Sequence, residues 1–249
     1  MTSSTSMQGK IALVTGASSG LGAETARLLS RRGATVFGIA RDTEKLASVF
    51  TDIQLGVYAP VDVSSPNACR SAVAQCVDRF AGIDVLINVA GHHQMRRTES
   101  MTDDDWEHDL AVNLNGPFYL CRAALPHLLA RGGNIVNVAS IAGVEGQAYS
   151  AGYCSAKHGL IGLTRALAVE YTSDRLRVNA VCPGGMLTPQ IEQFSAPENP
   201  DYNLILRSAA PRGMMQPSDV AAVIAFLASD DAAAVHGAVY RVDNGKGAG

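Results

Sequence analysis

The stretch Ile11-Ala-Leu-Val-Thr15-Gly16-Ala-Ser-Ser-Gly20-Leu-Gly22 decides the fold of this chain. Its first five residues are apolar or β-branched and predict a short buried strand that runs straight into a helix over 21–31. The three glycines permit a tight turn, let the backbone approach a pyrophosphate, and allow the helix to pack close to the strand. N–H groups at the start of such a helix attract phosphate. We therefore expect a dinucleotide-binding unit here.

Strand-like and helical stretches alternate along the rest of the chain. The strands are expected at 11–15, 34–40, 55–61, 83–89, 134–139, 176–181 and 238–242, and the helices near 21–31, 65–80, 103–130, 152–172 and 217–228. Such alternation is typical of a parallel sheet covered on both faces. We predict one α/β domain over 10–249, a Rossmann-like, doubly wound parallel sheet of about seven strands with helices on both faces, preceded by a flexible N-terminus at 1–9.

Length and composition exclude several other classes of protein. The chain has 249 residues, 47% apolar content and a net charge of −3, which gives no basic footprint for nucleic acid. No apolar run is long enough to span a bilayer, and residues 1–8 lack the apolar stretch of a secretory signal. The five cysteines are odd in number and have no metal-like spacing, which favours a reduced, cytoplasmic setting. We expect a cytoplasmic protein with a small-molecule partner, no metal, no nucleic acid and no membrane.

A tyrosine and a lysine stand four positions apart at Tyr153 and Lys157, so they share one face of a predicted helix. A free tyrosine has a pKa of about 10, too high for proton transfer at neutral pH, and a nearby ammonium lowers that pKa. The hydroxyl of Ser140, which follows a predicted strand, would hold a carbonyl or alkoxide oxygen against the same phenol. Together these three side chains indicate a proton-transfer site.

The chain resembles the short-chain dehydrogenase/reductase family from Lys10 to about Gly245. The resemblance rests on motifs that occur in the family's order, namely Thr15-Gly16-x-x-x-Gly20-x-Gly22, Asn88-Val-Ala-Gly91, Asn113, Ser140, Tyr153-x-x-x-Lys157 and Pro183-Gly184. It implies an NAD(P)-dependent oxidoreductase that transfers a hydride between nicotinamide and a secondary alcohol or ketone. It also implies a homo-oligomer, either a tetramer or a dimer.

The resemblance implies a catalytic tetrad of Asn113, Ser140, Tyr153 and Lys157. Tyr153 would exchange a proton with the substrate oxygen while Ser140 orients that oxygen. Lys157 would hydrogen-bond the nicotinamide ribose and lower the pKa of Tyr153, and Asn113 would anchor a water that links Lys157 to solvent. The residues implied to bind the cofactor are Gly16, Ser18, Ser19, Gly20, Leu21, Gly22, Arg41, Asp42, Asp62, Val63, Asn88, Ala90, Gly91, Tyr153, Lys157, Pro183, Gly184, Met186 and Thr188.

The residues after the second strand bear on the choice between the two nicotinamide cofactors. An acidic residue there binds the ribose of NAD, whereas an arginine accommodates the extra phosphate of NADP. The family's acidic position falls on Ala40 and is followed by Arg41, which favours NADP(H). Asp42 lies about twenty residues after Gly22, where a simple count places the NAD acid. Ser19 stands where many NADP-dependent relatives carry a basic residue, so NAD(H) remains the alternative.

On the substrate side, the cleft is expected to be lined by Ser140, Tyr153, His92, Glu145, Gln147 and Tyr149. Residues 189–215 contain four prolines and fit no single regular element, and the resemblance implies that they form a lid over the substrate. One alternative function is a 3-oxoacyl-[acyl-carrier-protein] reductase. From a different class, the alternative is a non-catalytic cofactor-binding or scaffold protein.

Overall fold

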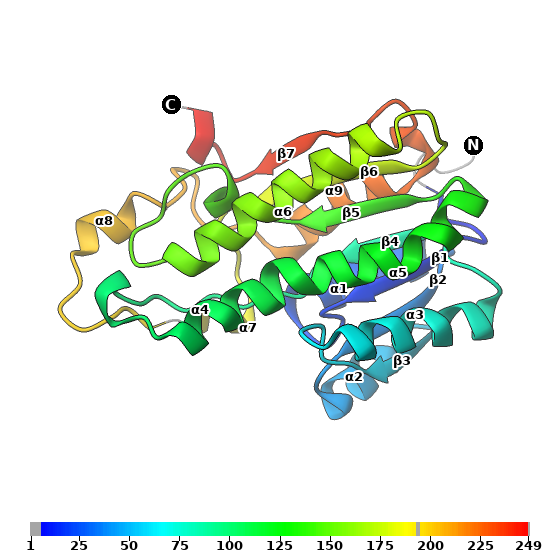
Figure 1. Cartoon of the computed structure of the whole chain (residues 1–249), viewed down its shortest axis with the longest axis horizontal. Helices are drawn as coiled ribbons and strands as arrows, with labels where there is room; N and C mark the ends of the chain where they lie inside the picture. Colours follow the sequence, from blue (N-terminus) through cyan, green and yellow to red (C-terminus); the bar gives the residue numbers. More distant parts are fainter. Residues whose placement is uncertain (1–5, 193–194, 249) are drawn as a thin grey trace.

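Seven strands form one parallel sheet in the order β3-β2-β1-β4-β5-β6-β7, in a computed structural model that describes residues 6–192 and 195–248 (Figure 1). The strands are β1 (Ile11–Thr15), β2 (Thr35–Ala40), β3 (Gly56–Pro60), β4 (Val85–Asn88), β5 (Asn134–Val138), β6 (Arg177–Pro183) and β7 (Val239–Val242). The strand order reverses between β1 and β4, which pair in parallel. Ligands of doubly wound sheets bind at the carboxyl edge of such a reversal.

Helices cover both faces of the sheet, so the predicted Rossmann-like fold is confirmed. One core cluster packs α1 (Gly20–Arg31), α2 (Thr43–Phe50) and α9 (Pro217–Ala228) on one face. The other packs α3 (Pro66–Phe80), α5 (Gly116–Arg131) and α6 (Ala151–Glu170) on the face that is turned to the viewer in Figure 1. None of the helices in the described ranges is long and apolar enough to cross a membrane.

The helix expected over 103–130 is in fact two helices, α4 (Asp103–Leu110) and α5, joined by a π-helical turn over Ala111–Asn115. Asn113 lies inside this turn and is fully buried. Its Nδ2 donates to the carbonyl of Asp109 at 2.9 Å and to that of His92 at 2.8 Å. A side chain that bonds the backbone competes with the helical ladder, and π turns of this kind often mark functional sites.

The chain is ordered earlier than the sequence indicated. Met7 is fully buried, and its N–H donates to the carbonyl of Arg32 at 2.9 Å. The N–H of Gly9 donates to the carbonyl of Gly33 at 3.2 Å. The expected flexible N-terminus at 1–9 is therefore too long at its inner end, because Met7 finds an apolar site under α1. Residues 1–5 lie outside the described residues.

The two ends of the segment predicted as a lid lie next to each other in the fold. Met186 and Met215 form a parallel bridge, and the N–H of Leu187 donates to the carbonyl of Met215 at 2.9 Å. Between them lie the short helices α7 (Pro189–Glu192) and α8 (Tyr202–Leu206). The ends of this segment are thus pinned to each other beside the carboxyl end of β6. Residues 193–194 of the predicted lid lie outside the described residues.

Candidate active site

The glycine-rich turn connects β1 to α1 at the carboxyl edge of the sheet. Gly16 and Gly20 have φ angles of 68° and 50°, which side chains with a Cβ rarely adopt. A methyl group on Gly22 would overlap the carbonyl oxygen of Gly16. The hydroxyl of Thr15 accepts the N–H of Ala90 at 2.8 Å and so ties the turn to the segment after β4. Glycine is therefore required by the close approach of α1 to the turn.

The first turn of α1 has no side-chain cap. Its N-cap residue, Ser19, makes no hydrogen bond from its side chain to the helix. By contrast, α2, α3 and α4 are capped by the side chains of Asp42, Ser65 and Thr102. Uncapped N–H groups at a helix N-terminus bind phosphate oxygens. The turn and the start of α1 therefore fit the pyrophosphate of a dinucleotide.

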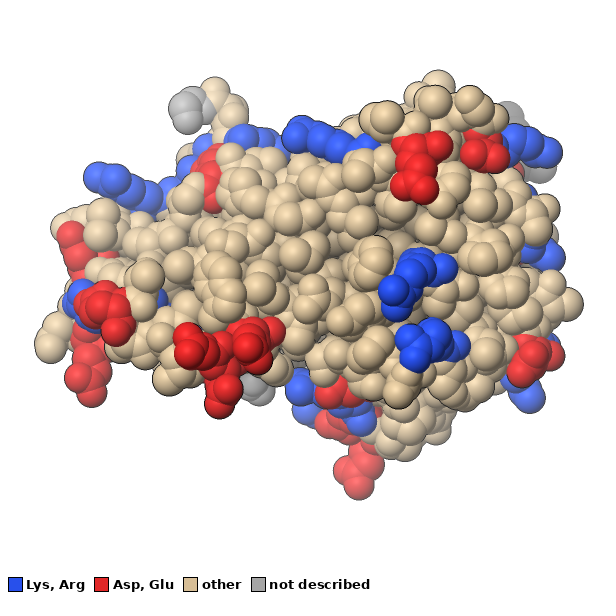
Figure 2. All heavy atoms as spheres, in the orientation of Figure 1, with Lys and Arg blue, Asp and Glu red and all other residues tan. Residues whose placement is uncertain are grey.

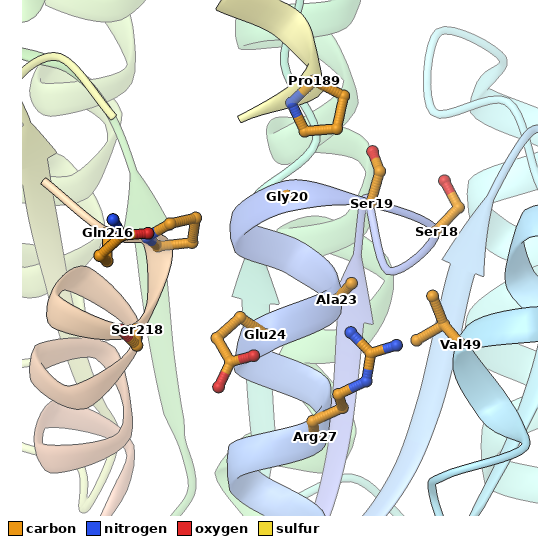
Figure 3. Close-up of a pocket in the computed structure, with 11 residues that line it drawn as sticks. Ser18, Ser19, Gly20, Ala23, Glu24, Arg27, Val49, Pro189, Gln216 and Ser218 are labelled. Atoms are coloured by element: carbon orange, nitrogen blue, oxygen red, sulfur yellow. The ribbon is translucent and has the colours of Figure 1, made fainter. Parts of the chain in front are cut away.

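A groove of about 420 Å³ runs along the outer side of this turn (Figure 3). Ser18 and Ser19 lie at one end of it, and Arg27 points toward them from the next turns of α1. Thr188, just after β6, closes the turn on its other side, because a methyl on Gly20 would lie 3.3 Å from Thr188 Cγ2. Leu21 is buried in the core, so only its backbone is available at the turn.

Arg41 and Asp42, the two residues on which the choice of cofactor depends, differ in what they already bind. Asp42 accepts the N–H of Lys45 at 3.0 Å as the N-cap of α2, and its carboxylate lies 3.3 Å from Lys45 Nζ. The backbone bond from Lys45 is the main reason that the pKa of Asp42 is lowered. Arg41 is exposed directly after β2. The Asp42 carboxylate is thus committed to the helix, whereas Arg41 faces solvent.

Asp62 and Val63 follow β3. Asp62 Oδ1 accepts the N–H and the hydroxyl of Ser64 at 2.9 Å and 2.8 Å. Partial burial opposes ionisation, but these two bonds outweigh it and lower the pKa of Asp62. Val63 is buried against the start of α5, where a methyl on Gly116 would lie 2.8 Å from the Val63 carbonyl oxygen. This packing fixes the segment after β3 at the carboxyl edge of the sheet.

Asn88, at the end of β4, points into the protein. Its Nδ2 donates to Asn137 Oδ1 on β5 at 2.8 Å, and Asn137 Nδ2 donates to the hydroxyl of Thr164 on α6 at 2.9 Å. All three residues are buried. The network fixes α6 relative to the two central strands. We did not single out Asn137 or Thr164 from the sequence, although an asparagine within the apolar run of β5 was a detectable signal.

Asn113, Ser140, Tyr153 and Lys157 come together at the carboxyl ends of β4 and β5. Lys157 Nζ donates to the carbonyl of Val138 at 2.9 Å and lies 5.7 Å from the centre of the Tyr153 ring. The Tyr153 hydroxyl forms a hydrogen bond with Ser140. Asn113 and Lys157 both lie beside Gly91. A methyl group on Gly91 would lie 3.1 Å from Asn113 Oδ1 and 3.5 Å from Lys157 Nζ.

The electrostatics of the pair differ from the expectation. Burial raises the pKa of Tyr153 to about 12, and the bond with Ser140 opposes this only in part. Burial also lowers the pKa of Lys157 to about 8. The expected lowering of the Tyr153 pKa is therefore not seen, because burial disfavours the charged phenolate. In this state Tyr153 is a neutral proton donor.

The residues predicted for the substrate side are less uniform. Glu145 is bound by two cations, with Oε1 at 2.8 Å from Arg241 and Oε2 at 2.8 Å from Lys246. Glu145 therefore tethers the C-terminal segment, and its expected place in the wall of the cleft stays a prediction. Gln147 is half-buried, and its carbonyl oxygen lies 4.0 Å from Cys154 Sγ.

Tyr149 has a φ angle of 61°, which is rare for an aromatic residue. Its hydroxyl accepts the N–H of Asp201 in the predicted lid at 3.0 Å. Arg97 lies over its ring and donates to the carbonyl of Asn199 at 2.6 Å. Tyr149 and Arg97 thus hold the lid segment in place.

The adjacent histidines His92 and His93 face different partners. His92 packs edge-on against His108, with ring centres 5.0 Å apart. His93, which the sequence places with His92 at the mouth of the cleft, stacks on Tyr153 with ring centres 4.2 Å apart. Nothing in the local sequence distinguishes the two, because the partners come from α4 and α6.

The segment after β6 completes the site. Pro183 ends the strand, and the N–H of Gly184 donates to the carbonyl of Val242 at 2.9 Å. A methyl on Gly184 would lie 3.1 Å from Asp243 Cα, so the two segments are in close contact. Met186 and Thr188 follow and lead into the lid. The predicted cofactor residues therefore occupy one continuous edge of the sheet.

An uncapped glycine turn at a sheet reversal, next to a Ser–Tyr–Lys cluster, defines a nicotinamide-dependent oxidoreductase. Residues 16–246 match a family described as enoyl-(acyl carrier protein) reductase. The chain is 39% identical to cyclohexanol dehydrogenase of Acinetobacter sp. (strain SE19), over 94% of this chain and 93% of that protein. The chain belongs to the short-chain dehydrogenase/reductase family and acts on CH–OH and C=O groups with NAD(P).

Solved structures agree with this assignment. A dehydrogenase/reductase from Sinorhizobium meliloti 1021 superposes with a TM-score of 0.90 at 30% identity, over 99% of this chain and 98% of that one. A 3-ketoacyl-(acyl-carrier-protein) reductase from Brucella melitensis, complexed with NADH, gives a TM-score of 0.88 at 28% identity, over 97% and 99% of the two chains. The fold is thus shared with both proteins, and the second of them binds the nicotinamide cofactor NADH.

Proposed function

We propose that the protein interconverts a neutral secondary alcohol and its ketone, and that it prefers NADP(H) to NAD(H). The observation that carries this proposal is the cluster of Tyr153 and the buried Lys157, with Ser140 close enough to oppose the rise of the Tyr153 pKa. A bound nicotinamide would supply or accept the hydride. Ser140 orients the substrate oxygen, Tyr153 exchanges the proton with it, and the ammonium of Lys157 favours the phenolate that forms. Asn113 fixes the backbone beside Lys157.

Four cations near the cleft already bind groups of the protein itself, which favours a neutral substrate. Arg96 lies 3.0 Å from Asp105, and Arg97 binds the backbone of the lid. Arg241 and Lys246 both bind Glu145. A carboxylate or phosphate on the substrate would need a cation that has no protein partner. Cyclic and aliphatic ketones make no such demand.

The same pairings disfavour a 3-oxoacyl-[acyl-carrier-protein] reductase, which we keep as the second candidate. An acidic carrier protein needs a basic patch beside the cleft. Arg96 and Arg97 are adjacent basic residues in the segment after β4, and both are engaged with the protein itself. Two other residues, Asp174 and Asn134, add nothing to a basic patch. Asp174 is acidic and exposed, and Asn134 is buried with Nδ2 bound to the carbonyl of Ala228.

Turnover of a panel of cyclic and aliphatic secondary alcohols and ketones, followed by nicotinamide absorbance, tests the proposal. We expect activity on neutral cyclic substrates and weaker activity on substrates that carry a carboxylate. A strong preference for a β-ketoacyl thioester on its carrier protein would overturn it in favour of the second candidate. Failure to bind either cofactor would favour the non-catalytic alternative.

Arg41 is proposed to bind the 2′-phosphate of NADP(H), because Asp42 is committed to the cap of α2. Replacing Arg41 with Ala should weaken NADPH binding by roughly tenfold, equivalent to ~1.4 kcal/mol, and leave NADH binding nearly unchanged. Fluorescence titration of both cofactors measures this, with Arg70→Ala on α3 as the matched control. Equal effects on NADPH and NADH would show that Arg41 does not recognise the phosphate.

We further propose that 189–215 acts as the substrate lid and that the chain forms a homo-oligomer. The pinned ends at Met186 and Met215, with Tyr149 holding the N–H of Asp201, support a hinged segment.

The face over α5 and α6 carries few charged side chains (Figure 2), and Phe118 and Val169 are exposed on these helices. Burying this face between two copies would exclude apolar surface from water. The unpaired cysteines fit a cytoplasmic location.

A further inference from the structure

The ring of His93 covers a face of the Tyr153 ring. The ring centres are 4.2 Å apart and the planes are inclined by 23°, which is a stacked geometry. His93 comes from the segment after β4, whereas Tyr153 comes from α6. Aromatic rings held at this distance attract each other by more than their buried area accounts for. The stack therefore joins the two halves of the site directly at the proton-donating residue.

Ser150 fixes the orientation of the His93 ring. His93 Nε2 lies 2.9 Å from the hydroxyl of Ser150, and that hydroxyl donates to the carbonyl of Ala148 at 3.2 Å. Ser150 is 1% exposed and immediately precedes α6. The imidazole is thus held in place by the residue that precedes the helix carrying Tyr153.

The His93 imidazole is neutral at physiological pH. Burial is the main cause, followed by the nearby His92, Lys157 and Arg96, and together they lower the pKa of His93 to about 4. A neutral ring contributes packing and shape at this site without adding a charge next to the phenol. At neutral pH the ring of His93 therefore adds no charge beside the phenol, and it contacts the phenol by stacking.

The position of the Tyr153 ring matters because it determines where the reacting hydroxyl lies. Its hydroxyl must meet both Ser140 and the substrate oxygen, and a displacement of about 1 Å can cost roughly 10²-fold in rate. Ser140 restrains the hydroxyl end, and Lys157 Nζ is 5.7 Å from the ring centre. The His93 ring is the aromatic surface that restrains the ring itself.

We propose that His93 is a positioning residue for Tyr153, whose stacked ring holds the phenol in the orientation that meets Ser140 and the substrate oxygen. This inference rests on the proposed role of Tyr153 as the proton donor. His93 acts through its ring face, and the bond to Ser150 sets the angle of that ring. The group that it serves is the phenol, so the effect belongs to the chemical step.

The substitutions His93→Ala and His93→Phe separate stacking from imidazole chemistry. His93→Ala should lower kcat by roughly 10–100-fold while KM and the cofactor Kd stay within about threefold. His93→Phe keeps an aromatic ring and should recover most of that loss. His158→Ala, an exposed histidine on α6, serves as the control and should behave as the wild type. An unchanged kcat in His93→Ala, or a loss in His93→Phe as large as in His93→Ala, overturns the proposal.

A spectroscopic test does not depend on turnover. The tyrosines are labelled with ¹³C in the ring, and the signal missing from Tyr153→Phe identifies Tyr153. Its ring signal should shift in His93→Ala and stay near the wild-type position in His93→Phe, while the other tyrosine signals do not move. An unmoved Tyr153 signal in His93→Ala would refute the stack. If the wild type turned over no alcohol or ketone while the signal shifted as expected, the proposed function alone would fail.

Discussion

Replacing Tyr153 with Phe should lower kcat by about 10²–10⁴-fold, because the substitution removes the proposed proton donor and little else. The ring stays in place, so the stack on His93 and the packing of α6 persist. Burial keeps the pKa of the phenol at about 12, so the wild-type side chain holds its proton through the neutral range. Steady-state kinetics with NADPH and a cyclic ketone measure the loss.

Cofactor binding separates a catalytic defect from a folding defect. The Kd for NADPH should stay within about threefold in Tyr153→Phe, since the phosphate-binding turn lies on β1 and α1. Tyr58→Phe, which removes a partly exposed hydroxyl on β3, is the matched control and should show wild-type kinetics. A kcat for Tyr153→Phe within threefold of the wild type would show that another group supplies the proton.

The fold was legible in the sequence because its determinants are local. A buried strand, three glycines and an amphipathic helix lie within about twenty residues, and each element carries its own pattern. The same holds for Tyr153 and Lys157, whose spacing alone places them on one face of α6. Local patterns therefore predicted the strands, their alternation with helices and the pairing of Tyr153 with Lys157 on one helix face.

What the sequence did not give depends on partners that are distant along the chain. Glu145 forms ion pairs with Arg241 and Lys246, which lie about a hundred residues further along the chain. In the π turn, the side chain of Asn113 donates to the carbonyl of His92, which lies 21 residues earlier in the chain. Spacing counts cannot register either contact, because both arise from the packing of separate elements.

Burial explains why the electrostatic prediction was also incomplete. The sequence showed that Lys157 would stand beside Tyr153, and a neighbouring charge alone would lower the phenol pKa. It did not show that both side chains would be removed from water, which disfavours both charged forms. The position of the lysine was predictable from local spacing, whereas its ionisation depends on the surrounding core.

Lys157 should therefore be costly to the fold while it is required for activity. A pKa near 8 in the folded protein, against 10.5 for the ordinary side chain, corresponds to roughly 3 kcal/mol of destabilisation at pH 7. Loss of the bond to the Val138 carbonyl would offset about 1 kcal/mol of any gain. Lys157→Met should thus raise the free energy of unfolding at pH 7 by about 2 kcal/mol and lower kcat by roughly 10²–10³-fold.

The stability gain should depend on pH in a defined direction. Below pH 8 the lysine is protonated in both the folded and the unfolded chain, so its full cost is present. Between about pH 8 and 10.5 only the unfolded chain binds the proton, so the wild type becomes more stable as pH rises and the gap to Lys157→Met closes. Urea unfolding at pH 7 and pH 9.5 measures the difference in unfolding free energy between the wild type and Lys157→Met. Lys45→Met replaces an exposed lysine and is the control, for which we expect no such difference. A Lys157→Met protein less stable than the wild type at pH 7 would mean that the ammonium is stabilised by its surroundings more than burial opposes it.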